Sequence, residues 1–343
     1  MRFRPLRPAS AITADPIEVP EPPERMRAAV IDAPGGPDAL HLGELPVPTP
    51  VLSELLVRVV AAGINQIDAK TRAGAGLSGS LKDFPVALGF DFSGIVVKAP
   101  YESHPLQPGS EVFGMVPFPR SGGSYAEYAV VPSLSVARKP STLSHVEAAG
   151  VPLAALTAWG LVVETARAHE GQRMLIHAGS GGVGHFAVQI ADYFGAHVTA
   201  TTSSHNTAWM RELGASTVID YATTRFEDVV SQMDVVIDLV GNAHEQTSTR
   251  SLSVLRPGGL HIVVPTGASP GYAEAAEAAG VRATGYKVVP DGSALATIGR
   301  LLDSGSVQVY VDKVFDLADA AAAHAELELG HARGKIVLRL SDD

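Results

Sequence analysis

Hydrophobic and polar residues alternate with two different rhythms along the chain. From Met26 to about Gly150, short apolar runs such as Glu54–Val60 are separated by Pro and Gly. Short strands at close spacing, with turn residues between them, predict a barrel-like β domain. From about Val151 to Pro290, Val- and Ile-rich runs alternate with amphipathic segments of helical length. This alternation predicts βαβ units, and so an α/β domain with a parallel sheet and helices on both of its faces.

Both ends of the chain depart from these rhythms. Residues 1–25 contain six prolines and no apolar run long enough for a secretory signal, so we expect an irregular N-terminal extension. After Pro290 the pattern predicts two helices and a closing strand at Lys335–Leu340. We expect residues 291–343 to return to the first domain. The α/β domain, residues 151–290, is then inserted between residues 26–150 and this tail.

The composition narrows the class of protein. The 343 residues are 46% hydrophobic and 18% charged, which is typical of a globular protein of about two domains. A net charge of −10, without any run of Lys and Arg, argues against binding to nucleic acid or to an anionic membrane. The most apolar uncharged stretch, Ala148–Val163, is too short to span a bilayer. We therefore expect a cytoplasmic protein that acts on a small molecule.

The strongest local motif is the segment His177–Gly184, which follows a predicted strand and begins a predicted helix. Its small residues Ala178, Gly181 and Gly184 are spaced by three, a variant of the dinucleotide fingerprint with Ala in the first place. Small residues let the backbone approach a pyrophosphate, and the free N–H groups of the helix start bind it. We predict cofactor contacts at Ala178, Ser180, Gly181, Gly182, Val183 and Gly184.

The end of the next predicted strand favours NADPH over NADH. Sites for NAD usually place Asp or Glu about 20 residues after the glycines, where the carboxylate binds the ribose hydroxyls. This chain has Thr201–Ser204 there, and no acidic residue before Glu212. Hydroxyl groups tolerate a 2′-phosphate that a carboxylate would repel. We predict contacts at Thr202, Ser203 and Ser204; the alternative is a polar loop that binds nothing.

Further motifs follow one another in a characteristic order: Ala61–Gly74, Leu88–Gly94, Pro108–Gly114, Gly122–Tyr128, Arg256–Gly259 and Gly334–Val337. Together with the glycine turn they resemble the medium-chain dehydrogenase/reductase superfamily, in its zinc-free quinone oxidoreductase (zeta-crystallin-like) branch. The resemblance covers the chain from Met26 onward. It implies a GroES-like β domain split around a Rossmann domain, with the active site in the cleft between them. It also implies a homodimer, joined through the segment near Gly285–Pro290.

The chemistry implied by the resemblance needs no metal. Zinc-dependent relatives hold a catalytic ion with a Cys in the first motif and a His-Glu pair in the second; here those places hold Asn65–Asp68 and Gly89–Asp91. The chain contains no cysteine, which excludes thiolate-based zinc sites, disulfides and a thiol nucleophile. We therefore predict no metal site. Without a Lewis acid, the expected reaction is hydride transfer from NADPH to a quinone or to the activated C=C of an enone.

Three candidate catalytic residues follow from the first motif. Asn65 matches the family position near the nicotinamide and the substrate, where its amide would orient the carboxamide or donate to a developing oxyanion; its alternative role is to stabilise a turn. Asp68 has either a direct role or a role in holding the local loop. Lys70 stands where many relatives have Tyr, and would stabilise an enolate unless it is a solvated surface lysine.

The resemblance also implies cofactor contacts in the second half of the chain. Thr157 matches a threonine near the nicotinamide, with helix packing as the alternative. Val240 matches the strand end whose backbone lies along the nicotinamide ribose, and Gly267 has the same place at the end of the next strand. Tyr221 resembles a tyrosine near the adenosine phosphate. Lys335 is either a cofactor contact or a strand-edge lysine that discourages aggregation.

One family feature is missing, and two further functions stay open. Relatives often have a Lys three residues after the second Ser; here that residue is Thr207, and His205 or Arg211 are candidate substitutes. The leading function is that of an NADPH-dependent quinone or enone reductase. The alternatives are an enoyl-thioester reductase of lipid or polyketide synthesis, distinguished by loops such as Pro117–Gly123, and a non-catalytic NADPH-binding sensor.

Overall fold

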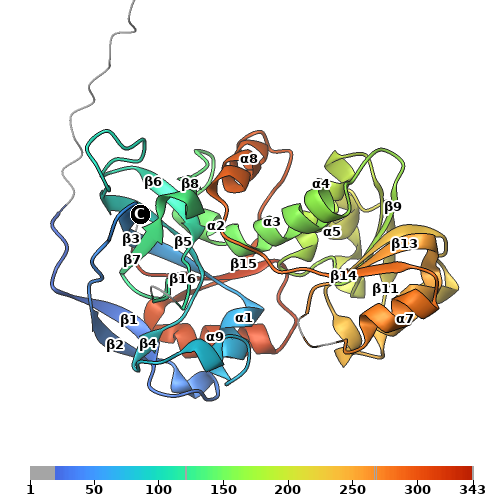
Figure 1. Ribbon diagram of the computed structural model, residues 1–343, viewed down its shortest axis with the longest axis horizontal. Helices are drawn as coiled ribbons and strands as arrows, with labels where there is room; N and C mark the ends of the chain where they lie inside the picture. Colours follow the sequence, from blue (N-terminus) through green and yellow to red (C-terminus); the bar gives the residue numbers. More distant parts are fainter. Residues whose placement is uncertain (1–19, 120–121, 266, 268, 342–343) are drawn as a thin grey trace, which may run out of the picture.

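The computed structural model describes residues 20–119, 122–265, 267 and 269–341. Most of the predicted extension, residues 1–19, therefore lies outside the described residues. The first strand, β1 (Arg25–Ile31), begins where the folded domain is predicted to start. Strands and helices form two halves side by side, with α3 (Pro152–Trp159) and α4 (Gly184–Tyr193) between them in the view of Figure 1.

A six-stranded parallel sheet forms one half of the molecule. Its order is β11-β10-β9-β12-β13-β14, and each neighbouring pair is parallel. The strands are β9 (Arg173–Ile176), β10 (His197–Thr202), β11 (Thr217–Asp220), β12 (Met233–Asp238), β13 (Leu255–Val263) and β14 (Arg282–Gly285). Because β9 and β12 are neighbours, the chain winds outward from this pair in both directions. This is the doubly wound sheet that the sequence predicts.

Both faces of this sheet are buried, because successive side chains of a strand point to opposite faces. In β9, Met174 and Ile176 lie in the large core cluster that includes residues of α3 and α4. Leu175, between them, lies in a second cluster with Ala276 of α7 (Tyr272–Ala278). The remaining helices of this half are α5 (Thr207–Glu212) and α6 (Thr247–Ser251), and α3 continues into a π-helix, Gly160–Thr165. No helix within the described residues is long and apolar enough to cross a membrane.

The other half is rich in β-strands that form two sheets. A three-stranded sheet has the order β2-β1-β4, with β2 (His41–Pro46) and β4 (Val86–Ala87). A seven-stranded sheet has the order β15-β16-β3-β5-β6-β8, with β7 also paired to β3. Its strands are β3 (Glu54–Ile64), β5 (Asp91–Lys98), β6 (Glu111–Met115), β7 (Tyr128–Pro132), β8 (Val136–Arg138), β15 (Val311–Asp316) and β16 (Lys335–Arg339).

The predicted β domain is present, but these strands do not close into a barrel. β1 pairs along one edge with β2, and on its other edge only its last two residues, Val30 and Ile31, pair with β4. Between the two sheets the described residues show only an isolated bridge from Ala28 to Ala126. The predicted strands are therefore present, and the part of the prediction that is corrected is their closure into a barrel.

The last strand lies in the same sheet as the early strands. β16 pairs antiparallel with β3, with Ile336 opposite Ile64. Helix α9 (Ala320–Glu328) packs near α1 (Gln66–Arg72), while α8 (Gly292–Asp303) packs on β8 and α2 (His145–Ala149) on β3. Figure 1 shows the red C-terminal segments among the blue and teal strands. The domain limits at residues 25, 150 and 290 stay predictions.

A single glycine allows β3 to pass α2 at close range. A Cβ atom on Gly63 would lie 2.3 Å from the carbonyl oxygen of Ala149 and 3.0 Å from Cβ of Asp91. Gly63→Ala should therefore lower the free energy of unfolding by about 1–3 kcal/mol, measured by urea denaturation. Gly79→Ala is the matched control, because nothing lies within 4 Å of that position. Equal stability of the two variants would contradict this packing.

Candidate functional site

The glycine turn after β9 has the geometry of a dinucleotide-binding turn. Ala178, in the first small position, has a φ of 52°, the left-handed conformation that normally favours glycine. At the third position, a Cβ on Gly184 would lie 2.1 Å from the carbonyl oxygen of Ala178. The start of α4 therefore approaches the turn so closely that only glycine fits. The N–H of Gly181 closes the turn on the Ala178 carbonyl (3.0 Å), and the N–H groups of Gly182 to Gly184 are held at the start of the ten-residue helix α4, the arrangement that binds phosphate.

The parallel sheet brings the other predicted cofactor residues to the same edge. Ser180, Ser203, Tyr221, Val240 and Gly267 follow β9, β10, β11, β12 and β13 respectively, so all lie beyond the carboxyl ends of parallel strands. Ligands of open α/β sheets bind at this edge, next to the point where the winding reverses. Here that point is between β9 and β12.

Hydrogen bonds connect the first of these strand ends. The Thr202 hydroxyl donates to Oγ of Ser180 (2.8 Å), and the backbone N–H of Tyr221 donates to the Thr202 carbonyl (3.1 Å). Thr202 is buried, whereas Ser204 and Tyr221 are exposed. The turn after β9 and the turn after β10 thus form one continuous polar rim.

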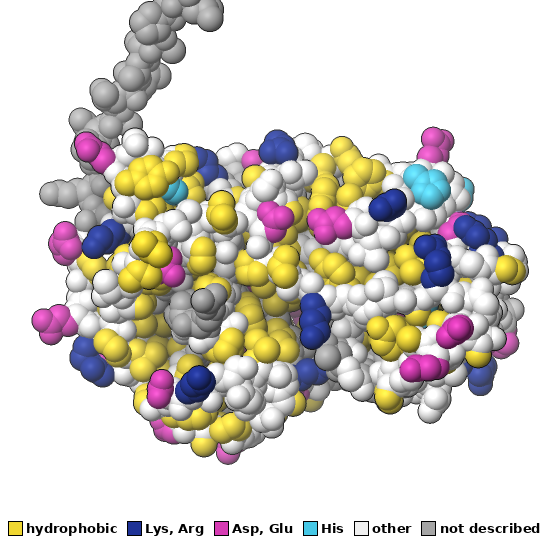
Figure 2. Space-filling model, in the orientation of Figure 1, with side chains coloured by type: hydrophobic (Ala, Val, Ile, Leu, Met, Phe, Trp, Pro, Cys, Tyr) yellow, Lys and Arg dark blue, Asp and Glu magenta, His cyan; other side chains and the backbone are white. Residues whose placement is uncertain are grey.

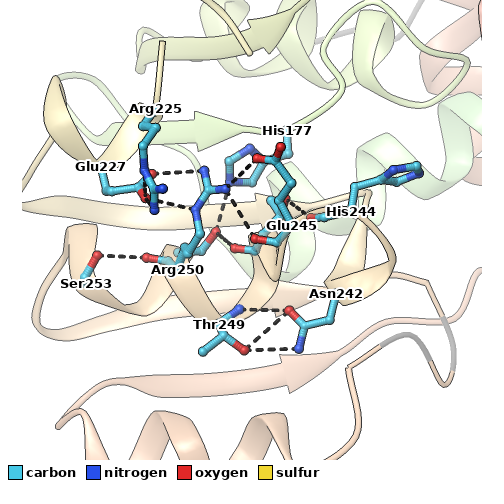
Figure 3. Close-up of polar contacts among 11 residues, drawn as sticks. His177, Arg225, Glu227, Asn242, His244, Glu245, Thr249, Arg250 and Ser253 are labelled. Carbon is cyan, nitrogen blue, oxygen red and sulfur yellow. Dashed lines mark hydrogen bonds and ion pairs between the residues drawn. The ribbon is translucent and has the colours of Figure 1, made fainter. Parts of the chain in front are cut away.

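A network of charged and polar side chains supports the segment after β12 (Figure 3). Arg250 of α6 forms ion pairs with Glu227 (2.9 Å) and Glu245 (3.2 Å). The backbone N–H of Thr249 donates to the Asn242 side chain (3.1 Å). His177 lies 2.9 Å from the Ser251 hydroxyl, which ties α6 to the end of β9. These contacts hold the segment after β12, together with α6, against the end of β9.

A cavity opens at the carboxyl ends of β13 and β14. It has a volume of about 510 Å³, and its lining includes Gly267, Tyr272, Tyr286 and Lys287. The predicted cofactor residue Gly267 therefore lies at an accessible hollow and not in packed core. Figure 2 shows hydrophobic side chains gathered over the β-rich half of one face of the molecule, with charged side chains scattered around them.

Asn65 lies in a buried polar cluster with Lys335 and Asp91. Nζ of Lys335 donates to Oδ1 of Asn65 (2.5 Å) and to the Ile64 carbonyl (3.0 Å), and lies 3.6 Å from Oδ2 of Asp91. Nδ2 of Asn65 donates to the same oxygen of Asp91 (2.9 Å). Burial lowers the pKa of Lys335 and raises the pKa of Asp91, and the attraction between the two charges opposes both shifts. The orientation of the Asn65 amide is therefore determined: oxygen towards the lysine, nitrogen towards the aspartate.

Asp68 continues this cluster away from Asn65. Its Oδ2 accepts the backbone N–H of Asn65 (2.8 Å) and the hydroxyl of Tyr125 (3.2 Å), while Oδ1 is buried without a hydrogen-bond partner. The Tyr125 hydroxyl also lies 3.1 Å from Nε2 of His324, whose Nδ1 lies 3.3 Å from the guanidinium of Arg72. Asp68 therefore holds the start of α1, and α1 and α9 are tied together through buried polar side chains.

The pKa of the Asp68 carboxyl group is strongly raised. Burial raises its pKa from 3.8 to about 7, against the effect of the Asn65 N–H, which favours the ionised form. His185 shows the opposite effect of burial on a base: its pKa falls to about 4, so the ring is neutral. Its Nδ1 lies 3.0 Å from the Gly181 carbonyl, so the neutral ring donates its proton there and steadies the turn.

The glycine turn and the Asn65 cluster are neighbours. The backbone N–H of Gly334 donates to the Ser180 carbonyl (2.9 Å). A Cβ on Gly182 would lie 3.3 Å from Cδ of Lys335. Lys335 therefore lies between the two, with its ammonium group on Asn65 and its alkyl chain beside the phosphate-binding turn.

Two predicted residues have surroundings that favour their alternative roles. Lys70 is exposed on α1, whereas Asn65 and Asp68 are buried. Thr157 is buried, and its hydroxyl donates to the Leu153 carbonyl of its own helix (2.6 Å). Their functional roles stay predictions.

The sequence reading missed three members of the cluster. Asp91 lies in the motif Leu88–Gly94, but was considered only as a metal ligand. Tyr125 lies in the motif Gly122–Tyr128, but nothing local showed its role, and His324 gave no signal, because their partners are distant in the chain. Within the described ranges, no three His, Asp or Glu side chains are grouped so that they could hold a metal ion.

Comparisons with known proteins identify the family. The family described as alcohol dehydrogenase GroES-like domain matches residues 52–141, and the family described as zinc-binding dehydrogenase matches residues 213–338. The "NAD(P)H oxidoreductase RTN4IP1, mitochondrial" of Danio rerio is 33% identical, over 93% of this chain and 92% of its own. The chain belongs to the medium-chain dehydrogenase/reductase superfamily. The motif-based assignment to this superfamily and its quinone oxidoreductase-like branch is confirmed.

Two further relatives of this superfamily member are informative. The "NADPH-dependent alkenal/one oxidoreductase, chloroplastic" of Arabidopsis thaliana is 33% identical, over 92% of this chain and 80% of its own. The solved quinone oxidoreductase from Coxiella burnetii is 34% identical, with a TM-score of 0.86 over 92% of this chain and 99% of its own. The Rossmann-type sheet and the GroES-like domain are thus both confirmed for this oxidoreductase.

The raised pKa of Asp68 predicts a stability that falls with pH. In the unfolded chain the carboxyl group ionises near 3.8, and in the folded protein near 7. Between these values the folded state binds the extra proton, so its stability falls by up to about 1.4 kcal/mol per pH unit as the pH rises. Asp68→Asn removes this contribution, so the variant should gain stability relative to the wild type from pH 4 to 7.

Urea denaturation at several pH values measures this difference, with the exposed Asp83→Asn as control. A stability difference between wild type and Asp68→Asn that does not change with pH would show that the carboxyl group ionises alike in both states. That outcome would contradict the proposed environment of Asp68.

Proposed function

We propose that this oxidoreductase transfers hydride from NADPH to a quinone or to the activated C=C of an enone, without a catalytic metal. The observation that carries the proposal is the contact between the glycine turn and the Asn65 cluster through Gly334 and Lys335. It places a dinucleotide-binding turn beside an oriented amide, where the reactive end of the cofactor has to meet its acceptor. The names of the alkenal/one and quinone relatives support the same acceptor classes.

NADPH, when bound, supplies the hydride. The chain's own residues bind and orient it: the N–H groups after Ala178 hold the pyrophosphate, and Val240 and Gly267 border the nicotinamide ribose. We assign Thr202, Ser203, Ser204 and Tyr221 to the adenosine phosphate. The sequence has no acidic residue between Thr201 and Glu212, and this absence favours NADPH over NADH.

Asn65 is the proposed donor to the oxygen that gains negative charge. One N–H of its amide is engaged by Asp91, and no described residue engages the second. The ammonium group of Lys335, on the amide oxygen, polarises the amide and strengthens this donor. A fixed donor aimed at a developing enolate or quinol oxygen lowers the barrier, because it needs no reorganisation during the reaction.

Asn65→Ala should lower kcat by about 100-fold while changing the KM for NADPH little, measured from NADPH absorbance in single-acceptor assays. Lys70→Met, assayed in parallel, distinguishes the two roles left open for that residue. A loss as large as that of Asn65→Ala would place Lys70 in the site. Unchanged kcat in Asn65→Ala, with an unchanged melting temperature, would remove Asn65 from the mechanism.

The reaction itself is tested with purified protein, NADPH or NADH, and a panel of quinones, 2-alkenals and a crotonyl thioester. We expect NADPH oxidation with a quinone or an alkenal, unaffected by a chelator. Turnover of the crotonyl thioester alone would favour the enoyl-thioester reductase. Tight NADPH binding without turnover of any acceptor would favour the sensor, and a loss of turnover on chelation would contradict the metal-free mechanism.

We further propose a homodimer and a cytoplasmic location. The exposed edge strand β14 and the segment near Gly285–Pro290 form the proposed interface, where two sheets would join edge to edge. Relatives carry the words mitochondrial and chloroplastic in their names. Size-exclusion chromatography with light scattering tests the first proposal, and cell fractionation the second.

A further inference from the structure

The proposed 2′-phosphate site lacks a cation in the place where relatives often have one. Thr207 stands three residues after Ser204, and the hydroxyl groups of Ser203 and Ser204 carry no charge. A phosphate monoester carries a charge of about −1.5 to −2 at neutral pH and is usually bound by Arg or Lys. A selective NADPH site in this chain therefore needs a positive charge, for which His205, Arg211 and residues of other segments are the candidates.

Arg333, in the C-terminal segment, provides a positive charge near the helix that follows Ser203 and Ser204. Its guanidinium carbon lies 4.1 Å from the centre of the Trp209 ring and 4.5 Å from that of Tyr310. Trp209 is on α5, which begins three residues after Ser204. Stacking on two rings holds the planar guanidinium in place, so little side-chain entropy is lost when it binds an anion.

The guanidinium group of Arg333 has no anionic partner within the part of the chain that the structure describes. No carboxylate of those residues lies within 4.0 Å of it, and its Nε is buried without a hydrogen-bond partner. Asp312 accepts only the backbone N–H of Arg333 (3.3 Å). Arg250 and Arg256, by contrast, are each paired with a carboxylate. A half-buried arginine without a partner, in a protein of net charge −10, indicates a site for an external anion.

The position of Arg333 points to a phosphate of the cofactor. The next residue, Gly334, donates its N–H to Ser180 of the glycine turn (2.9 Å). Ser180 is bonded in turn to Thr202, which directly precedes Ser203. Arg333 is thus connected on one side to the pyrophosphate turn and on the other, through Trp209, to the helix that follows Ser203 and Ser204.

We propose that Arg333 binds the 2′-phosphate of NADPH and replaces the missing lysine as the residue that selects NADPH over NADH. The proposal rests on the NADPH use put forward above. We favour the 2′-phosphate over the pyrophosphate as the ligand of Arg333. The backbone N–H groups of the turn already serve the pyrophosphate, whereas Ser203 leaves the 2′-phosphate without a cation. The planar guanidinium offers two parallel N–H donors to the phosphate oxygens.

The test compares the dissociation constants of NADPH and NADH for the full chain, by titration calorimetry or by quenching of Trp fluorescence. Arg333→Met should raise the Kd of NADPH by about 10- to 100-fold, the range for one charge-assisted bond, and leave the Kd of NADH within about twofold. Arg333→Lys, which keeps the charge but loses the fork and the stacking, should fall between the two. Adenosine 2′,5′-bisphosphate should lose affinity as NADPH does, and 5′-AMP should not.

Arg300→Met, on the distant helix α8, is the control for the loss of one exposed positive charge. Retained NADH binding shows that an Arg333 variant is folded. An equal loss for NADH and NADPH would overturn the proposal and move Arg333 to the pyrophosphate; unchanged NADPH affinity would overturn it as well. If the wild type binds neither cofactor, the proposed function itself fails, whatever Arg333 does.

Discussion

The buried ammonium group of Lys335 is the contact on which the organisation of the site depends. It lies at the first residue of β16 and reaches Asn65 at the end of β3 and Asp91 at the start of β5. Burying a charge is costly unless it is paired and hydrogen-bonded, and here both conditions are met. The contact requires one register of β16 against β3, because a shift by one residue would turn the side chain to the opposite face of the sheet.

Three consecutive residues then serve three different purposes. Arg333 lies between the rings of Trp209 and Tyr310, Gly334 donates its N–H to the glycine turn, and Lys335 reaches Asn65. Gly334 has a φ of 73°, and a Cβ there would lie 2.3 Å from the Tyr310 carbonyl, so this close passage requires glycine. The glycine turn and the orientation of the Asn65 amide are therefore coupled through one short segment near the end of the chain.

Local motifs were read correctly from the sequence where one segment contained the whole signal. The strand, small-residue turn and helix around Ala178–Gly184 needed no distant partner to be recognised. Asp91 was found but misjudged, because its role follows from Lys335, which lies 244 residues further along the chain. Tyr125 and His324 were missed for the same reason: their hydrogen bond joins residues separated by 199 positions. The barrel-like expectation needed correction, because strand patterns alone do not show that, among the described residues, only an isolated bridge joins β1 to the segment before β7.

The sequence by itself determined the fold class, the dinucleotide-binding turn, the family and the acceptor chemistry expected of a chain without cysteine. Periodicity, glycine spacing and composition are local or additive properties, so they can be read without coordinates. Only the tertiary structure decided how the Asn65 amide is oriented, that burial raises the pKa of Asp68 to about 7 and that Arg333 lacks an anionic partner among the described residues. All three findings depend on how deeply a side chain is buried and on which distant segments lie beside it. Neither burial nor such long-range contact is a property of any single stretch of sequence.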